Sequence, residues 1–286
     1  MPRLILRDPA AALPATAPER PRDTPAASSA ATVDASGTRH RRPAATTRAP
    51  GTLDLASVLF SQGFGTRREC AARVRAGTVR IAGRACTDPD EPVATAGLVF
   101  NVDGRDWPHH ERALLMLHKP AGYECSIRPR HHPGVLALLP PPLRQRGVQP
   151  VGRLDADTTG LLLLTDDGSL LHRLTSPRHH VPKVYEVGTR HPVTPAQLQS
   201  LREGVVLDDD PRPARAAAAE ATGERTLRLT LTEGRYHQVK RMMAAVGNRV
   251  ETLHRSAVGA LRLPADLAPG QWRWVAPAEL EPSASP

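Results

Sequence analysis

Two kinds of apolar pattern along the chain predict β-strands. Unbroken apolar runs at 114–117 and 161–164, the second within a strand expected over 161–165, fit strands that are buried on both faces. Alternation of apolar and polar residues at 183–187 and 227–231 fits strands that are buried on one face. Because these strands do not alternate regularly with helices, the pattern predicts an α+β domain over 113–280.

A helix with one buried face is predicted near the end of this domain, from about Tyr236 to Val246. Its apolar residues recur at the i, i+3, i+4, i+7 spacing of one helix face: Val239, Met242, Met243 and Val246. At about 100° per residue, Lys240 falls beside this face and Arg241 falls nearly opposite it. We therefore expect Lys240 to run its stem along the core toward an interior carboxylate, and Arg241 to face a phosphate or solvent.

A small basic module is predicted at 53–98. Its second helix should begin at Thr66, which has capping-box spacing with Glu69, and end at Gly77, before a hairpin that turns at Ala82-Gly83. Four arginines lie on this helix: Arg67, Arg68, Arg73 and Arg75. Two helices and a hairpin with clustered arginines resemble the S4 RNA-binding domain, which implies that these arginines bind RNA. The alternative is a small helical module with a solvated basic face.

The first fifty residues are rich in Pro, Ala, Ser, Thr and Arg, with almost no large apolar residue after Leu6. Such a segment cannot bury enough surface to offset the entropy lost on ordering. We therefore predict a disordered basic tail over 1–50. A transit peptide is the alternative, although the prolines and acidic residues weigh against it.

The charge balance and the cysteines narrow the class of protein. The 286 residues include 38 Lys and Arg against 29 Asp and Glu, a formal net charge of +9, which favours a polyanionic partner. An anionic membrane would also attract this charge, but the sequence has no obvious basic amphipathic helix and no apolar run that could span a bilayer. Three scattered cysteines fit a reducing compartment. We expect a cytoplasmic protein with no membrane association.

The loop from Arg153 to Gly160 carries the candidate chemistry. It lies between two apolar strand segments and so holds Asp155 at the edge of a rigid sheet, where a functional carboxylate is well positioned. On local sequence alone, a loop aspartate such as Asp155 or Asp157 more often caps a turn.

Several separated motifs together resemble one family. Gly152-Arg-Leu-Asp155, followed by Thr158-Thr-Gly-Leu161, is similar to the catalytic motif of a large group of pseudouridine synthases. Further motifs resemble the branch of that group that acts on 16S ribosomal RNA. They are His118–Ser126, Thr175–His180, Lys183–Tyr185, Glu233–Met242, Gly247–Arg255 and Leu267–Gly270. The resemblance covers about Leu53 to Leu280, with an S4 domain in its usual place.

The resemblance implies an isomerase that converts one uridine of 16S ribosomal RNA, uridine 516, to pseudouridine. It implies a mixed, largely antiparallel sheet with flanking helices, preceded by the small S4-like α/β domain. The reaction involves no redox change and no phosphate transfer, so we expect neither a cofactor nor a metal. The expected partner is 16S ribosomal RNA or a small-subunit assembly intermediate, and the expected state is a monomer.

The resemblance also assigns roles to residues. Asp155 takes the place of the catalytic aspartate, in a covalent or proton-abstracting role. An ionised carboxylate in a partly dry pocket needs a cation close by, and Lys240 is the candidate, although related enzymes often have Arg there. Tyr185 matches the active-site tyrosine, whose ring can stack on the extracted uracil. Arg153 is expected to fill the space left by the flipped uridine or to bind the adjacent phosphate, and Arg241 to contact RNA.

Three other functions compete with this hypothesis. A metal-dependent nuclease could use Asp155, Asp157, Asp166 and Asp167 as oxygen ligands, although Asp166-Asp167-Gly168 is an ordinary turn signal. A glycosidase would need paired carboxylates and aromatic sugar platforms, and aromatic residues are scarce. A non-catalytic RNA-binding or assembly factor would rely on the S4-like module and leave Asp155 and Tyr185 unexplained.

Overall fold

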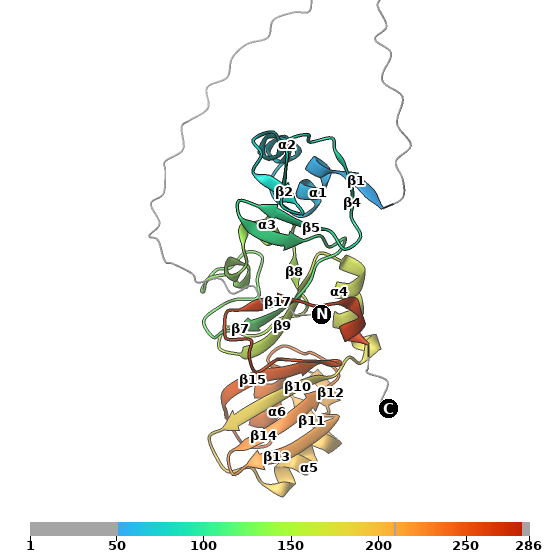
Figure 1. Cartoon of the computed structure of the whole chain (residues 1–286). Coiled ribbons are helices and arrows are strands. Elements are labelled where there is room, and N and C mark those ends of the chain that lie inside the picture. Colours follow the sequence, from blue (N-terminus) through green and yellow to red (C-terminus); the bar gives the residue numbers. More distant parts are fainter. Residues whose placement is uncertain (1–50, 209, 282–286) are drawn as a thin grey trace, which may run out of the picture. The chain divides into compact units, whose positions relative to one another are not determined.

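Two short helices and two small sheets follow residue 50 in the computed structural model, which describes residues 51–208 and 210–281 (Figure 1). The tail predicted over 1–50 lies outside the described residues. The helices are α1 (Leu55–Ser61) and α2 (Arg67–Arg75). One sheet pairs β1 (Thr52–Asp54) with β4 (Pro92–Ala94). The other is antiparallel in the order β3-β2-β5-β6, formed by β2 (Val79–Ile81), β3 (Arg84–Cys86), β5 (Val99–Val102) and β6 (Arg105–Pro108).

Local signals in the sequence set the bounds of α2 and of the hairpin after it. The Thr66 hydroxyl accepts from the Glu69 amide at 3.3 Å, and the Glu69 carboxylate accepts from the Thr66 amide at 2.7 Å. The helix is followed by Gly77 at φ +70°, a left-handed conformation that favours glycine. The hairpin then turns at Ala82-Gly83, both with positive φ. These elements are therefore as predicted.

A large mixed sheet forms the rest of the chain, in the order β13-β14-β10-β15-β9-β7-β17. Its strands are β7 (Leu114–Lys119), β9 (Thr159–Thr165), β10 (Lys183–Thr189), β13 (Ala218–Gly223), β14 (Thr226–Leu231), β15 (Val250–Val258) and β17 (Trp272–Trp274). β8 (Gln149–Pro150) pairs with β9, and β16 (Leu261–Arg262) pairs with β15. Among the named strands of the described residues, only β9 and β15 pair in parallel. The α+β class and the largely antiparallel sheet are confirmed.

The remaining elements connect these strands. They are the helices α3 (Pro141–Gln145), α4 (Gly168–Thr175), α5 (Pro195–Glu203) and α6 (Gln238–Ala245), the 3-10 turns η1 (Val135–Leu138), η2 (Pro177–His179) and η3 (Pro277–Leu280), and the hairpin of β11 (Val205–Leu207) with β12 (Asp210–Ala214). The α6 helix contacts β15 of the large sheet and β11 of the hairpin. Val239, Met242 and Met243 of α6 are buried in a core that also takes in Leu227, Leu229 and Leu231 of β14. The buried faces predicted for both elements are confirmed.

Strands β7 and β9 are covered on both faces. Alternate residues of each strand enter two different cores. One core receives Leu115 and Leu117 of β7 with Leu162 and Leu164 of β9. The other receives Leu114 and Met116 of β7 with Leu161 and Leu163 of β9. Burial on both sides explains why each strand is an unbroken apolar run rather than an alternating one.

The first of these cores is shared between the basic module and the large sheet. Leu55, Leu59 and Phe100 of the module belong to the same buried cluster as Leu115 and Leu162 of the sheet. The described residues accordingly form a single compact unit. The module and the sheet therefore share one hydrophobic core.

A buried arginine joins the same two parts by hydrogen bonds. The Arg146 side chain, only 4% exposed, pairs with Asp166 at the end of β9. Its other nitrogens donate to the Gln62 side chain at 2.6 Å and to the carbonyls of His110 and Glu111 at 2.6 and 2.9 Å. Asp166 also accepts from the amide of Ala113 at 2.7 Å. Asp166 is therefore a structural carboxylate.

Two predicted boundaries differ from the structure. The helix expected from Tyr236 begins at Gln238, because His237 before it takes a left-handed conformation with φ 47°. The turn expected at 166–168 opens α4, because the Asp167 carboxylate accepts from the amides of Ser169 and Leu170 and so caps that helix.

Candidate active site

A buried lysine holds the loop that carries Asp155 by hydrogen bonds to its backbone. The Lys119 side chain is fully buried at the end of β7, and its ammonium donates to the carbonyls of Thr158 at 2.8 Å, Pro120 at 3.0 Å and Ala156 at 3.2 Å. Burial lowers the pKa of Lys119. The amide of Thr158 also donates to the Asp155 carbonyl at 3.1 Å, which closes a turn. The backbone around Asp155 is thereby fixed.

At its end, the same loop enters β9 and approaches the backbone of β15 very closely. Gly160 has φ +107°, and a Cβ built there would lie 2.3 Å from the carbonyl oxygen of Arg255. Only glycine fits both the conformation and the space. Across the sheet, Gly160 is paired with Arg255, and Arg255 is paired with Tyr185 on β10. The loop motif and Tyr185 are thus brought together by the pairing of three strands.

The carboxylate of Asp155 lies between two side chains of the Tyr236–Lys240 segment. His237 Nε2 is 3.2 Å from one carboxylate oxygen and Lys240 Nζ is 3.3 Å from the other. The Asp155 side chain is 29% exposed, so the group is half-buried but reachable. The pairing of Lys240 with Asp155, expected from helical phase, is present in the structure. Sequence reasoning did not identify His237.

Lys240 has a second and closer partner. Its ammonium donates to both carboxylate oxygens of Asp157, at 2.7 and 2.8 Å. Partial burial would raise the pKa of Asp157, but the hydrogen bond and charge of Lys240 outweigh it and hold that pKa below its ordinary value. Burial would lower the pKa of Lys240, but the hydrogen bond to Asp157 and the charges of both aspartates outweigh it and raise that pKa. Lys240 is therefore firmly charged beside Asp155.

Asp155, His237 and Lys240 line one cavity of about 770 Å³. Its walls include the predicted residues Arg153, Asp155, Tyr185 and Lys240, and also His237, Lys183 and Arg255. Tyr185 is half-buried and packs against the cores on both sides of it. A space of this size accepts a nucleoside.

A basic loop borders this cavity. It runs from Ser126 to His132 and contributes Arg128, Arg130 and His131 to the cavity lining. The carboxylate of Glu124 accepts from three successive backbone amides of this loop, those of Arg130, His131 and His132, at 2.8 to 3.1 Å. Those hydrogen bonds lower the pKa of Glu124. An ionised Glu124 thus gives a basic surface loop a fixed shape.

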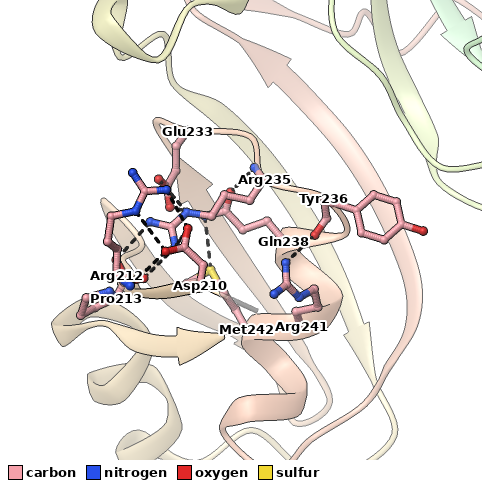
Figure 2. Close-up of polar contacts among 9 residues, drawn as sticks. All are labelled: Asp210, Arg212, Pro213, Glu233, Arg235, Tyr236, Gln238, Arg241 and Met242. Atoms are coloured by element: carbon pink, nitrogen blue, oxygen red, sulfur yellow. Dashed lines mark hydrogen bonds and ion pairs between the residues drawn. The ribbon is translucent and has the colours of Figure 1, made fainter. Parts of the chain in front are cut away.

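The turn that leads into α6 is braced by a network of ion pairs and hydrogen bonds (Figure 2). Arg235 donates to the Arg212 carbonyl at 2.7 Å, and it lies 3.2 Å from Glu233 and 3.3 Å from Asp210. Gln238 donates to Glu233 at 2.7 Å and accepts from the Arg235 amide at 2.8 Å. The side chains hold the turn that presents His237 to Asp155.

The other arginines predicted to bind RNA lie away from the cavity lining. Arg67, Arg68, Arg73 and Arg75 are exposed on α2. The Arg73 guanidinium pairs with Asp103 at 2.8 Å, and that of Arg67 lies 4.4 Å above the Phe60 ring. Arg241 donates to the Tyr236 carbonyl at 3.1 Å, so it braces the same turn. Contact of these arginines with RNA stays a prediction.

The ligand set required by the nuclease alternative is not assembled. Asp166 is paired with Arg146 and Asp167 caps α4, so neither is near Asp155 as a ligand. Within residues 51–208 and 210–281, no group of three or more His, Cys, Asp or Glu side chains could hold a metal ion. No helix of those residues is long and apolar enough to cross a membrane.

Comparison with known proteins gives consistent matches. Residues 113–245 match the family described as RNA pseudouridylate synthase. The ribosomal small subunit pseudouridine synthase A of Yersinia pestis is 46% identical over 172 residues, which cover 60% of this chain and 73% of that protein. The Escherichia coli K12 protein of the same name is 48% identical over 164 residues, 57% of this chain and 71% of that protein.

Two further relatives extend the match into the basic module. The uncharacterized RNA pseudouridine synthase YtzG of Bacillus subtilis is 39% identical over 231 residues, 80% of this chain and 97% of that protein. A crystal structure of a pseudouridylate synthase has a TM-score of 0.57 at 34% identity and covers 80% of this chain and 98% of that one. The predicted pseudouridine-synthase fold is confirmed, and the chain belongs to the family of RNA pseudouridine synthases, enzymes that isomerise uridine within RNA.

Proposed function

We propose that this enzyme isomerises one uridine of 16S ribosomal RNA, the one corresponding to uridine 516, with Asp155 as its nucleophile. The substrate is supported by the relatives at 46% and 48% identity, which are named for the small ribosomal subunit. The mechanism is supported above all by one observation, the Asp155 carboxylate held at 3.2 to 3.3 Å between His237 and Lys240 in a cavity of nucleoside size.

The chemistry fits these groups. The bond between uracil N1 and ribose C1′ breaks, the base turns, and C5 bonds to C1′, while a proton leaves C5 and N1 gains one. No oxidant, reductant or metal is needed for this balance. The charged Lys240 lies 3.3 Å from the Asp155 carboxylate and holds it in place for attack. The Tyr185 ring stacks on the extracted uracil, and Arg153 at the cavity wall binds the adjacent phosphate or fills the vacated space.

Binding of the surrounding RNA is assigned to basic surfaces outside the cavity. The module at 53–98 acts as an S4-like RNA-binding domain, with Arg67, Arg68, Arg73 and Arg75 toward phosphates. The basic loop at 126–132 lies nearer the target nucleotide, and Arg241 supports the turn beside it. The substrate is free 16S ribosomal RNA or a small-subunit assembly intermediate, bound by a monomer in the cytoplasm.

The first test is Asp155→Asn in a single-turnover assay with a 16S ribosomal RNA fragment that carries tritium at uridine C5. Release of tritium reports bond formation at C5. The asparagine keeps the shape but cannot attack as an anion, so release should stop while RNA binding stays nearly intact. Asp157→Asn is the matched control and should keep most of the rate. Substantial turnover by Asp155→Asn would remove Asp155 from the mechanism.

The target nucleotide is identified by a separate measurement. Pseudouridines are mapped on ribosomal RNA from cells with and without the gene. Loss of a single pseudouridine, at the position of uridine 516, is expected. An unchanged small-subunit RNA would show that the substrate is a different RNA.

A further inference from the structure

Tyr236 is an exposed aromatic side chain at the cavity. It is 68% exposed, although aromatic residues make up only 3% of the chain, and it contributes to the cavity lining. One face of its ring is covered, because it stacks on the His237 ring with centroids 3.8 Å apart and an angle of 23°. With that much exposure, the opposite face is open to solvent.

The position of this ring is fixed by its backbone. The Tyr236 carbonyl accepts from Arg241, and Arg235 and Gln238, which flank the Tyr236-His237 pair, belong to the braced network. Figure 2 shows the Tyr236 ring pointing away from the network around Arg235. The His237 backbone is in the left-handed conformation, which residues other than glycine rarely adopt. Such a rigid presentation of an open apolar ring suggests a binding surface.

Nucleic-acid bases are the ligands that suit this surface. Every base has a π-face that stacks on an aromatic side chain, and the extrusion of a uridine leaves the face of its neighbour uncovered. Tyr236 and His237 both line the cavity where the uridine would react, and His237 joins the stacked Tyr236 ring to Asp155. Cations on the same cavity wall, Lys240 and Arg130 among them, favour RNA over an uncharged partner.

We propose that Tyr236 is a stacking platform for the RNA base next to the flipped uridine. The proposal rests on the proposed function, because it takes RNA as the substrate. The bound base lies on the open face of Tyr236 and so extends the stack of Tyr236 on His237. Since His237 also contacts Asp155, seating this base steadies the imidazole beside the reacting carboxylate.

The test compares Tyr236→Ala with Tyr236→Phe, which keeps the ring. Equilibrium binding of the 16S ribosomal RNA fragment is measured for both variants and for the unmodified protein. We expect Tyr236→Ala to weaken binding about ten-fold and Tyr236→Phe to bind like the unmodified protein. The side chain is exposed, so both variants should melt at the original temperature.

The partner base is found with RNA fragments that each lack one base near the target uridine. At the stacked position, the abasic RNA should bind the unmodified protein about ten-fold more weakly but should bind Tyr236→Ala no more weakly than intact RNA does. Equal affinity of Tyr236→Ala and the unmodified protein, or fully additive losses at every abasic position, would overturn the platform. Because binding needs no turnover, this result is independent of the tritium assay that tests the proposed function.

Discussion

At the scale of single residues, the phase of a helix decides which of two neighbouring cations reaches the Asp155 carboxylate. Lys240 lies beside the buried face of α6 and contacts both Asp155 and Asp157. Arg241, one position later, points to the Tyr236 carbonyl. The two residues have the same charge, so their different roles come from direction alone.

Replacing each cation by Met separates these roles. Lys240→Met keeps the packed stem but removes the charge, and we expect the single-turnover rate to fall about a hundred-fold, as for loss of one preorganised electrostatic partner. Arg241→Met should leave the rate at saturating RNA within a few-fold and act mainly on RNA affinity. A larger rate loss from Arg241→Met would contradict the assignment of Lys240.

The same pair of variants has an expected pH signature in stability. Asp157 has a folded pKa below its ordinary 3.8, so it stabilises the fold above that pH, and the contribution fades as the pH falls through the folded pKa. Lys240→Met removes that lowering, so its stability should decline less on acidification below about pH 4. The Asp157 side chain is 70% exposed, which keeps the difference small. Urea unfolding of both variants from pH 6 to pH 3 measures it.

Residue roles that depend on periodicity were predictable, and those that depend on backbone exceptions were not. Helical phase placed Lys240, and not Arg241, beside the buried face, and the family resemblance named Asp155 as its partner. His237 could not be predicted, because its left-handed conformation takes it out of the helix that the phase describes. Lys119 offered one usable signal, a lysine at the end of an apolar strand, but two of its carbonyl partners, Ala156 and Thr158, lie 37 and 39 residues away, and no sequence period connects them to it.

At the scale of elements, the parallel pairing of β9 with β15 depends on one glycine. Gly160→Ala would place a Cβ 2.3 Å from the Arg255 carbonyl at a positive φ, so we expect a loss of about 3 kcal/mol or more in the free energy of unfolding. Activity should fall together with stability, because the same strand pairing brings the Asp155 loop to Tyr185.

Gly168→Ala is the matched control for this substitution. A Cβ at Gly168 meets no atom within 4 Å, and the residue lies in the first turn of α4. Its free energy of unfolding should stay the same or rise slightly, by up to about 1 kcal/mol. Denaturant unfolding of both variants measures the contrast, and equal stability of the two would mean that the strands separate at little cost.

Elements were predictable where a cap or an alternating pattern marks them. The capping box of α2 marked the correct start of that helix, and β14 followed its alternating leucines. β12 and β13 were not predicted. They contain Pro, Arg and Glu on exposed edges, and their strand conformation comes from pairing with β11 and β14.

At the scale of the whole molecule, the basic module shares a core with the sheet, although the sequence suggested two separate domains. An apolar pattern shows that a residue is buried but not which element buries it. Leu55 and Leu162 are both in one cluster, and nothing in either local pattern could predict that. Deleting the module would therefore uncover the core of the sheet, so its role in RNA binding is better tested by changing its surface charge.

The double variant Arg68→Gln and Arg75→Gln makes that change on one exposed face of α2. If this face binds phosphates, the affinity for structured RNA should fall and the slope of log affinity against log salt should decrease by about 2. The single-turnover rate at saturating RNA should stay the same. Arg202→Gln with Arg225→Gln, two exposed arginines outside the module, is the matched control. An unchanged salt slope in the α2 variant would show that the face does not bind RNA.

The place of β15 in the sheet also has a consequence for the order of folding. β9 and β10 do not pair with each other, because β15 lies between them, and Arg255 reaches back 94 residues to the Leu161 carbonyl. During synthesis, a chain that has not yet reached Val250 therefore holds two half-sheets with unpaired edges. Such edges attract other strands, so this stage is the one at which a growing chain is most prone to aggregate. Contacts so distant in sequence also form slowly, so we expect the pairing of β15 with β9 and β10 to be the slow step that joins the two half-sheets.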